Sequence, residues 1–384
     1  MSENLKTDSQ CSIALYIHIP FCLRKCKYCS FVSYAGKEGL IPDYVESLKK
    51  EIIQRLHAVS VCSVYFGGGT PSLLAVREIE TILQTIDSVS HLKRTAEITI
   101  EANPGTVSLE KLKEFRAIGI NRLSLGVQSF NDKELHLLGR IHTADEAAEA
   151  LHLARSAGFL NINVDLIYGV PGQTIGDWQN TLEHLVRLAP QHISLYALTL
   201  EEDTELWREI ENGNVIAPDP DIAADQYEMA EIFLCSRSYK QYEIANWSQE
   251  AYRCRHNMVY WQCHPYLGVG VAAHSYLNSH RLANTKDISR YIQAIFMGKL
   301  AVEADEEIAP DLRVAEALIL GLRLTDGIVL SEYERRYGVN IGELYHNQIE
   351  ELSRLCLLED KAGRLKLTLK GRLLGNEVFY RFLP

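Results

Sequence analysis

The chain has 384 residues, of which 47% are hydrophobic and 23% charged, and its formal net charge is −11 at pH 7. This length allows two or three domains, and the acidic balance without a block of Lys and Arg argues against nucleic acid or an anionic membrane as a partner. Residues 1–12 lack the basic and apolar regions of a secretory leader, and no apolar run reaches the about 20 residues of a membrane-spanning helix, so we expect a cytoplasmic protein.

Short apolar runs alternate with amphipathic segments through the first half of the chain, which is typical of a parallel sheet with helical crossovers. The expected strands are Ala14–Ile19, Ser63–Phe66, Glu97–Glu101, Arg122–Val127, Asn161–Ile167 and His192–Leu198. The expected helices are Tyr44–Leu56, Val76–Val89, Leu109–Ile118, Ala144–Ala157 and Gly176–Leu188. Six such units predict an open or partial barrel, with a doubly wound sheet as the alternative. Polar residues cluster after the strands, where barrels of this kind place their sites.

The loop after the first expected strand contains Cys22, Cys26 and Cys29 in a CxxxCxxC spacing. Three thiolates at this spacing can hold three irons of a [4Fe-4S] cluster, and no fourth cysteine follows nearby, which leaves one iron open to the amino and carboxylate groups of S-adenosylmethionine. The alternative is a zinc site made from these cysteines and His18, but zinc prefers paired spacings. The other cysteines are scattered, and most are expected to be small buried hydrophobic residues: Cys11, Cys62, Cys235, Cys254, Cys263 and Cys356.

Three consecutive glycines, Gly67–Gly69, follow the second expected strand and precede Thr70. Without β-carbons, the backbone there can closely approach the ammonium and carboxylate groups of a ligand. A glycine-rich segment is often only a tight turn. One strand away from the cysteine loop, it indicates a site for S-adenosylmethionine.

The regular alternation ends after about Leu200, and a mixed region continues to about Leu300. From Asp311, helices followed by strand-like alternation at Gly363–Leu369 and a final helix predict a winged-helix-like unit. We therefore expect an α/β protein of three parts, with a partial barrel at 1–215, a mixed α/β extension at 216–305 and a small C-terminal winged-helix-like domain at 306–384.

The string YIHIPFCLRKCKYCSF, from Tyr16 to Phe31, occurs together with FGGGTP, ITIEANP, GVQSF and DLIYGVPGQ. This set resembles the oxygen-independent coproporphyrinogen III oxidase family of radical SAM proteins, and it is most similar to the HemW-like branch of heme chaperones. The resemblance covers most of the chain, with the motifs in the family's order. It implies a partial (β/α)6 TIM-like barrel, the radical SAM core, with the cluster and S-adenosylmethionine at the carboxyl ends of the strands.

The resemblance also implies which residues contact S-adenosylmethionine. The aromatic and glycine-turn contacts are Tyr16, Tyr28, Gly68, Gly69 and Thr70, and the polar contacts are Glu101, Gln128, Arg140 and Asp165. An arginine can pair with the ligand's carboxylate, and the other polar groups can accept from its ribose hydroxyls or its ammonium group. The alternative for each is an ordinary structural role, such as a surface ion pair for the arginine.

The second half contains an HNxxYW motif, His256-Asn257-Met258-Val259-Tyr260-Trp261, which the HemW-like branch links to heme. Imidazole is a standard axial ligand of heme iron, and Tyr260 and Trp261 suit a flat apolar macrocycle. The alternative is that His256 bonds a loop while the two rings fill the core. His274 is a second candidate ligand.

Two features separate the chain from the oxidase itself. Phe31 stands where the oxidase has a further cysteine, and only 15 residues precede Tyr16, where the oxidase has a longer arm. We therefore expect a heme chaperone that transfers heme to apo-hemoproteins and carries the cluster and S-adenosylmethionine. The alternative is an oxidoreductase that decarboxylates coproporphyrinogen III to protoporphyrinogen IX. We also consider a cluster-dependent homodimer.

Overall fold

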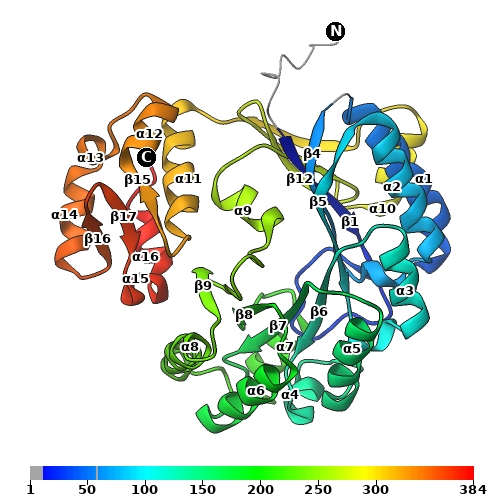
Figure 1. Ribbon diagram of the computed structural model, residues 1–384, viewed down its shortest axis with the longest axis horizontal. Helices are drawn as coiled ribbons and strands as arrows, with labels where there is room; N and C mark the ends of the chain where they lie inside the picture. The colour runs from blue at the N-terminus through cyan, green and yellow to red at the C-terminus, as the bar shows by residue number, and fades with distance from the viewer. Residues whose placement is uncertain (1–11, 58) are drawn as a thin grey trace.

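The computed structural model describes residues 12–57 and 59–384, and in this part of the chain twelve strands form one curved sheet (Figure 1). The strand order is β14-β13-β12-β11-β1-β4-β5-β6-β7-β8-β10-β9. Residues 1–11, which include Cys11 and nearly all of the segment considered above for a leader, lie outside the described residues. No described helix combines the length and apolar character that crossing a membrane requires.

Six neighbouring parallel strands form the middle of the sheet and confirm the predicted partial barrel. They are β1 (Ser12–Ile19), β4 (Ser60–Gly68), β5 (His91–Ala102), β6 (Arg122–Gln128), β7 (Ile162–Tyr168) and β8 (His192–Ala197). Each overlaps one of the expected strands. Because the strands are parallel, their carboxyl ends meet at one edge, and the polar segments that follow them come together there.

The crossover helices lie on the outer side of the curved sheet (Figure 1). They are α1 (Ile41–Arg55), α2 (Val76–Val89), α3 (Leu109–Ala117), α5 (Ala144–Ser156) and α6 (Ile175–Leu188). Their buried faces carry the apolar residues of the expected amphipathic segments. Two of them begin with a capping box, Thr143 with Glu146 and Thr174 with Asp177, which satisfies the first free N–H groups. The short helix α4 (Asp132–Leu137) was not expected.

The region after β8 extends both edges of the same sheet. Antiparallel β10 (Asn246–Ser248) and β9 (Lys240–Glu243) follow β8, whereas β11 (Tyr266–Val269) pairs in parallel with β1 and is followed by β12 (His274–Leu277), β13 (His280–Asn284) and β14 (Val302–Glu307). The helices here are α7 (Glu205–Glu211), α8 (Pro220–Cys235), α9 (Arg255–Trp261) and α10 (Ile288–Phe296). Figure 1 shows α9 between the sheet and the C-terminal domain.

The C-terminal residues form a winged-helix-like unit with its own hydrophobic core, as the sequence predicts. Its elements are α11 (Pro310–Leu322), β15 (Ile328–Val329), α12 (Leu330–Tyr337), α13 (Ile341–Leu344), α14 (His346–Arg354), β16 (Leu358–Lys361), β17 (Arg364–Leu367), α15 (Leu369–Leu373) and α16 (Gly375–Tyr380). The wing is the β16–β17 hairpin, whose turn residues have positive φ angles. The expected boundaries at 215/216 and 305/306 stay predictions.

A buried carboxylate joins α1 to the extension. Glu51 is fully buried and accepts hydrogen bonds from Arg55 (3.1 Å), Asn284 (2.8 Å), Tyr291 (2.7 Å) and the backbone N–H of Gly270 (2.8 Å). These donors come from α1, β13, α10 and the segment after β11. One side chain therefore fixes the second half of the chain against the first helix of the barrel.

Replacing Glu51 with Ala should lower the free energy of unfolding by about 3 kcal/mol, because it leaves the Arg55 guanidinium buried without its counter-charge and the Tyr291 hydroxyl and the Gly270 N–H without their acceptor. Urea denaturation followed by circular dichroism measures this. The matched control is Glu46→Ala on the same helix, where an exposed carboxylate pairs with Lys49 and the loss should stay below about 0.5 kcal/mol. Equal losses in the two variants would contradict the assigned role of Glu51.

Candidate functional site

The glycine turn after β4 packs directly against the cysteine loop. The backbone N–H of Gly69 donates to Ile19 O (2.8 Å) and that of Thr70 to Phe21 O (2.8 Å). A β-carbon at position 69 would lie 2.7 Å from Phe21 O and 3.0 Å from Cys22 Sγ. Only glycine therefore permits this approach. The Thr70 hydroxyl adds a contact of 3.6 Å to the same sulfur.

The three loop cysteines are free thiols, and electrostatic interactions among them affect the pKa of Cys22 and of Cys29. Burial raises the pKa of Cys22 and Cys29, and the neighbouring cysteines contribute in the same direction. Arg140 donates to Cys26 Sγ at 3.4 Å. Burial therefore favours the protonated thiols of Cys22 and Cys29, and binding of a metal would release those protons. The donor set and the glycine cradle thus fit a thiolate-bound iron–sulfur cluster.

The zinc alternative gains no support from the geometry. Among the described residues, no three His, Cys, Asp or Glu side chains come together as a single-ion site requires. Both ring nitrogens of His18 have partners, since Nε2 lies 2.9 Å from Val32 O and Nδ1 lies 3.1 Å from the Tyr16 hydroxyl. A cubane cluster binds each thiolate through a different iron, so it does not need the cysteines at single-ion distances.

Arg140 lies at the centre of a second group of polar atoms beside the cysteine loop. Its guanidinium donates to Asn103 Oδ1 (2.5 Å) and Gly126 O (2.6 Å), while its buried Nε has no hydrogen-bond partner in the structure. The Gln128 amide belongs to the same group of atoms. A β-carbon at Gly126 would lie 3.0 Å from Asn103 and 3.1 Å from Gln128, so both side chains border this position. A buried donor that lacks an acceptor suits a ligand carboxylate.

Tyrosines and a carboxylate line the inner face of the sheet. Glu101 accepts from the Tyr65 hydroxyl (2.8 Å) and from the backbone N–H of Gly68 (3.1 Å). Tyr16 stacks on Tyr65 with a centroid distance of 6.2 Å. Burial, reinforced by Asp165, raises the pKa of Glu101 to about 7. A cation entering this space would favour the ionised form of Glu101 and lower that pKa again.

The remaining predicted residues include Asp165, on β7, and Tyr28, on the cysteine loop. Asp165 accepts from Ser124 (3.0 Å) and Asn163 (2.8 Å), and burial raises its pKa. Tyr28, on the cysteine loop, packs on a small apolar cluster that includes Leu138. Burial raises the pKa of Tyr28, and Arg140 opposes that shift. Of the predicted residues, Glu101 and Gln128 lie at the carboxyl ends of β5 and β6, whereas Tyr16 and Asp165 lie in the middle of β1 and β7.

The HNxxYW motif lies on α9, with its histidine turned inward. His256 is 1% exposed, and its Nδ1 and Nε2 lie 2.9 Å from Ser63 Oγ and 2.8 Å from the Tyr260 hydroxyl. Burial, aided by Arg122, lowers the pKa of His256 to about 3, so the ring is neutral. Both of its nitrogens are therefore occupied within the protein.

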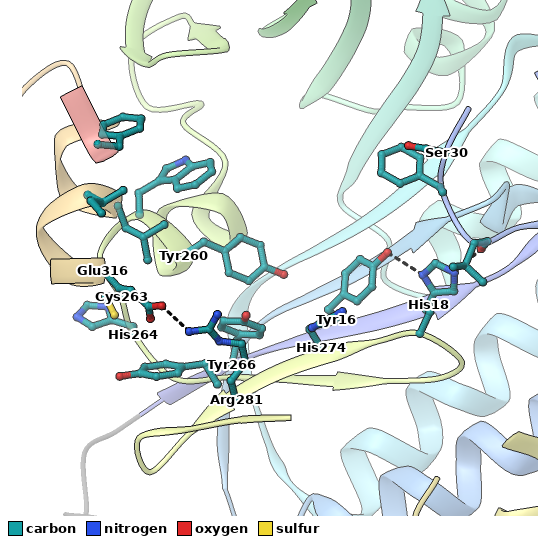
Figure 2. Close-up of a pocket in the computed structure, with 18 of the residues that line it drawn as sticks. Tyr16, His18, Ser30, Tyr260, Cys263, His264, Tyr266, His274, Arg281 and Glu316 are labelled. Atoms are coloured by element: carbon teal, nitrogen blue, oxygen red, sulfur yellow. Dashed lines mark hydrogen bonds and ion pairs between the residues drawn. The ribbon is translucent and has the colours of Figure 1, made fainter. Parts of the chain in front are cut away.

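A large cavity, here called the aromatic cavity, lies between the β11–β13 edge of the sheet, the end of α9 and the C-terminal domain (Figure 2). Its volume is about 980 Å³. Tyr16 and His18 line it from β1, Tyr260 and Trp261 from α9, and Ser30, Phe31 and Val32 continue into its wall directly from the cysteine loop. His256 is not among the lining residues.

Sequence reasoning missed several residues of both regions. Asn103 bridges Thr70 and Arg140, and its place in the quoted ITIEANP string was the available signal. The other cavity residues that were missed belong to no motif: Cys263, His264, Tyr276, Arg281, Lys286, Glu316 and Phe379.

Comparison with known proteins places the chain among radical SAM proteins. Residues 16–185 match the Radical SAM superfamily, and residues 308–374 match the HemN C-terminal domain. Heme chaperone HemW of Lactococcus lactis is 35% identical over 368 residues, covering 96% of each chain, and that of Bacillus subtilis is 32% identical, covering 96% of this chain and 98% of the relative. Bovine radical S-adenosyl methionine domain-containing protein 1, mitochondrial, is 36% identical, covering 84% and 70%.

A solved structure shares the whole architecture. Coproporphyrinogen III oxidase (HemN) from Escherichia coli superposes with a TM-score of 0.85 at 25% identity, covering 97% of this chain and 90% of that one. The likeness extends through the sheet extension and the C-terminal domain.

Replacing Glu101 with Gln should flatten the pH dependence of stability in the ligand-free protein. The folded state keeps its proton up to about pH 7, whereas the unfolded chain loses it near pH 4.3. Wild-type stability should therefore fall relative to E101Q as the pH rises between these two values. The fall should be on the order of 2 kcal/mol, which is less than the full pKa shift implies, because the carboxyl group is partly exposed to solvent.

Urea denaturation at half-unit pH steps measures this difference. The exposed Glu110, at the start of α3, provides the control variant Glu110→Gln, which should keep the wild-type slope. Parallel curves for wild type and E101Q would refute the assignment.

Proposed function

The chain belongs to the HemW family of radical SAM proteins, and we propose that it binds heme and delivers it to apo-hemoproteins. In this proposal it also carries a [4Fe-4S] cluster on Cys22, Cys26 and Cys29, with S-adenosylmethionine beside it. The observation that carries the proposal is the aromatic cavity, which continues directly from the cysteine loop through Ser30, Phe31 and Val32.

The chemistry of the aromatic cavity suits a tetrapyrrole. Ligand pockets of about 300–1,000 Å³ with mainly apolar and aromatic walls bury most of a ligand's surface. Here Tyr260 meets Tyr266 edge to face at 4.7 Å, and Trp261 lies beside them. Imidazole groups of His264 and His274 reach the same space. Apolar walls with imidazole donors are what heme iron and its macrocycle require.

The polar groups at the strand ends support the assignment of S-adenosylmethionine. The unpaired Nε of Arg140 suits the methionine carboxylate, and Glu101 suits a cationic group because its proton leaves near pH 7. The remaining proposed contacts are Tyr16, Tyr28, Gly68, Gly69, Thr70, Gln128 and Asp165. When bound and reduced, the cluster supplies an electron for cleavage of the sulfonium. The residues named here hold the ligand in place and keep water out.

Anaerobically purified protein should contain roughly four iron and four sulfide per chain. Alanine at Cys22, Cys26 or Cys29 should remove this content, because each thiolate is proposed to hold one iron. Cys62→Ala is the matched control, since that thiol lies on β4 and donates to Ile13 O, and its loss should leave iron and sulfide unchanged. Finding one zinc and no iron in the wild type would refute the cluster.

Hemin titration of the full chain should produce a Soret band that saturates at one heme per chain. The absence of any spectral change would refute the chaperone proposal. The alternative activity is tested by incubating the reconstituted, reduced protein with coproporphyrinogen III and S-adenosylmethionine under argon. We expect no protoporphyrinogen, because Phe31 occupies the position of the oxidase's further cysteine, and its formation would favour the oxidase.

Three parts of this proposal rest on the sequence alone. They are the cytoplasmic location, the transfer of heme to apo-hemoproteins and the formation of a cluster-dependent homodimer. Size-exclusion chromatography before and after cluster reconstitution separates the last of these from heme binding.

A further inference from the structure

The aromatic cavity contains three histidines, and only two of them can bind iron without losing a partner. His18 already uses both ring nitrogens. His264 and His274 are exposed to the cavity, and among the described residues neither side chain has a hydrogen-bond partner. A free imidazole nitrogen is the donor that heme iron requires.

His256, the histidine of the HNxxYW motif, is placed differently. It is buried outside the cavity lining, and iron binding would have to break its hydrogen bond to Ser63 or to Tyr260. Breaking a buried hydrogen bond leaves an unsatisfied group, which is unfavourable. In the structure His256 instead fixes the hydroxyl of Tyr260, whose ring forms part of the cavity wall.

The surroundings distinguish His274 from His264. His274 begins β12, where its backbone pairs with Ala283 of β13. Figure 2 shows His274 on the side of the cavity with Tyr16 and His18, and His264 on the opposite side beside Cys263. His264 follows Cys263, whose φ is positive, directly after α9. The imidazole on the sheet is thus held by a strand pair near the cysteine loop.

Two positively charged side chains, Lys286 and Arg281, lie near His274 and also line the cavity. Partial burial lowers the pKa of His274, and Lys286 and Arg281 lower it further, so the ring is neutral at pH 7 and its lone pair is available. Arg281 is already paired with Glu316. The ammonium of Lys286 is exposed at the cavity and has no carboxylate partner among the described residues. Heme carries two propionates, and Lys286 can pair with one of them.

On the premise that the protein carries heme, we propose that heme lies in the aromatic cavity with its iron on His274 and a propionate on Lys286. The imidazole nitrogen donates its lone pair to the ferric iron and displaces a water or hydroxide from the axial position. His256 is then a positioning residue that holds Tyr260 against the macrocycle.

Hemin titration of the full chain, read by absorbance and electron paramagnetic resonance, tests this assignment. His274→Ala should lose the histidine-ligated spectrum and bind hemin roughly tenfold more weakly, which corresponds to about 1.4 kcal/mol. Added imidazole should restore the spectrum in this variant, which a misfolded protein would not allow. Lys286→Glu should weaken binding and leave the spectrum unchanged.

Three further variants complete the experiment. His256→Ala and His264→Ala should both keep the histidine-ligated spectrum, and His152→Ala, on the exposed face of α5 away from the cavity, should match the wild type. If the wild type binds hemin but His274→Ala keeps its spectrum and affinity, the ligand assignment is wrong and the chaperone proposal stands. If the wild type binds no hemin, the proposed function fails together with the inference.

Discussion

The close contact between the glycine turn after β4 and the loop after β1 is the constraint on which the site depends. Position 69 cannot hold a β-carbon, because one would collide with Phe21 O and Cys22 Sγ. The backbone N–H of Gly68 donates to Glu101 at the end of β5. The turn therefore ties the ends of three strands together and sets the position of the first cysteine. Hydrogen bonds between backbone groups of the turn and the loop stabilise this arrangement.

The central barrel could be predicted from sequence because its signals are local. The segment Val76–Val89 is amphipathic and forms a helix with the predicted bounds. The additions at the two sheet edges could not be predicted in the same way. Tyr266–Val269 is a short apolar run that pairs with β1, some 250 residues earlier, and nothing local specifies that partner. The left-handed φ of Gln128 also arises where the β6–β7 register shifts, which is a tertiary effect.

The candidate site shows the same difference between local signals, which sequence reveals, and long-range contacts, which it does not. The cysteines, the glycines and Glu101 lie in strings whose spacing carries their chemistry, and the structure brings them to one edge of the sheet. The HNxxYW motif indicated His256 as a candidate heme ligand, but it could not show which groups surround the imidazole ring. Ser63, which takes up one ring nitrogen, is 193 residues away, and the other nitrogen is held by Tyr260. A histidine whose motif suggests an iron ligand can therefore instead hold in place the residues that line the neighbouring cavity.

The polar site at the strand ends and the aromatic cavity share part of one wall. Tyr16 lies beside Glu101 in the barrel interior and also lines the aromatic cavity, where its hydroxyl contacts His18. Burial and the nearby Glu101 carboxyl raise the pKa of Tyr16, so its hydroxyl stays neutral. Ser30, Phe31 and Val32 follow Cys29 without a break and also line the cavity, where Val32 O lies 2.9 Å from His18 Nε2. The cysteine loop and this part of the cavity wall are thus consecutive residues of one segment, which the hydrogen bond between His18 and Val32 holds against β1.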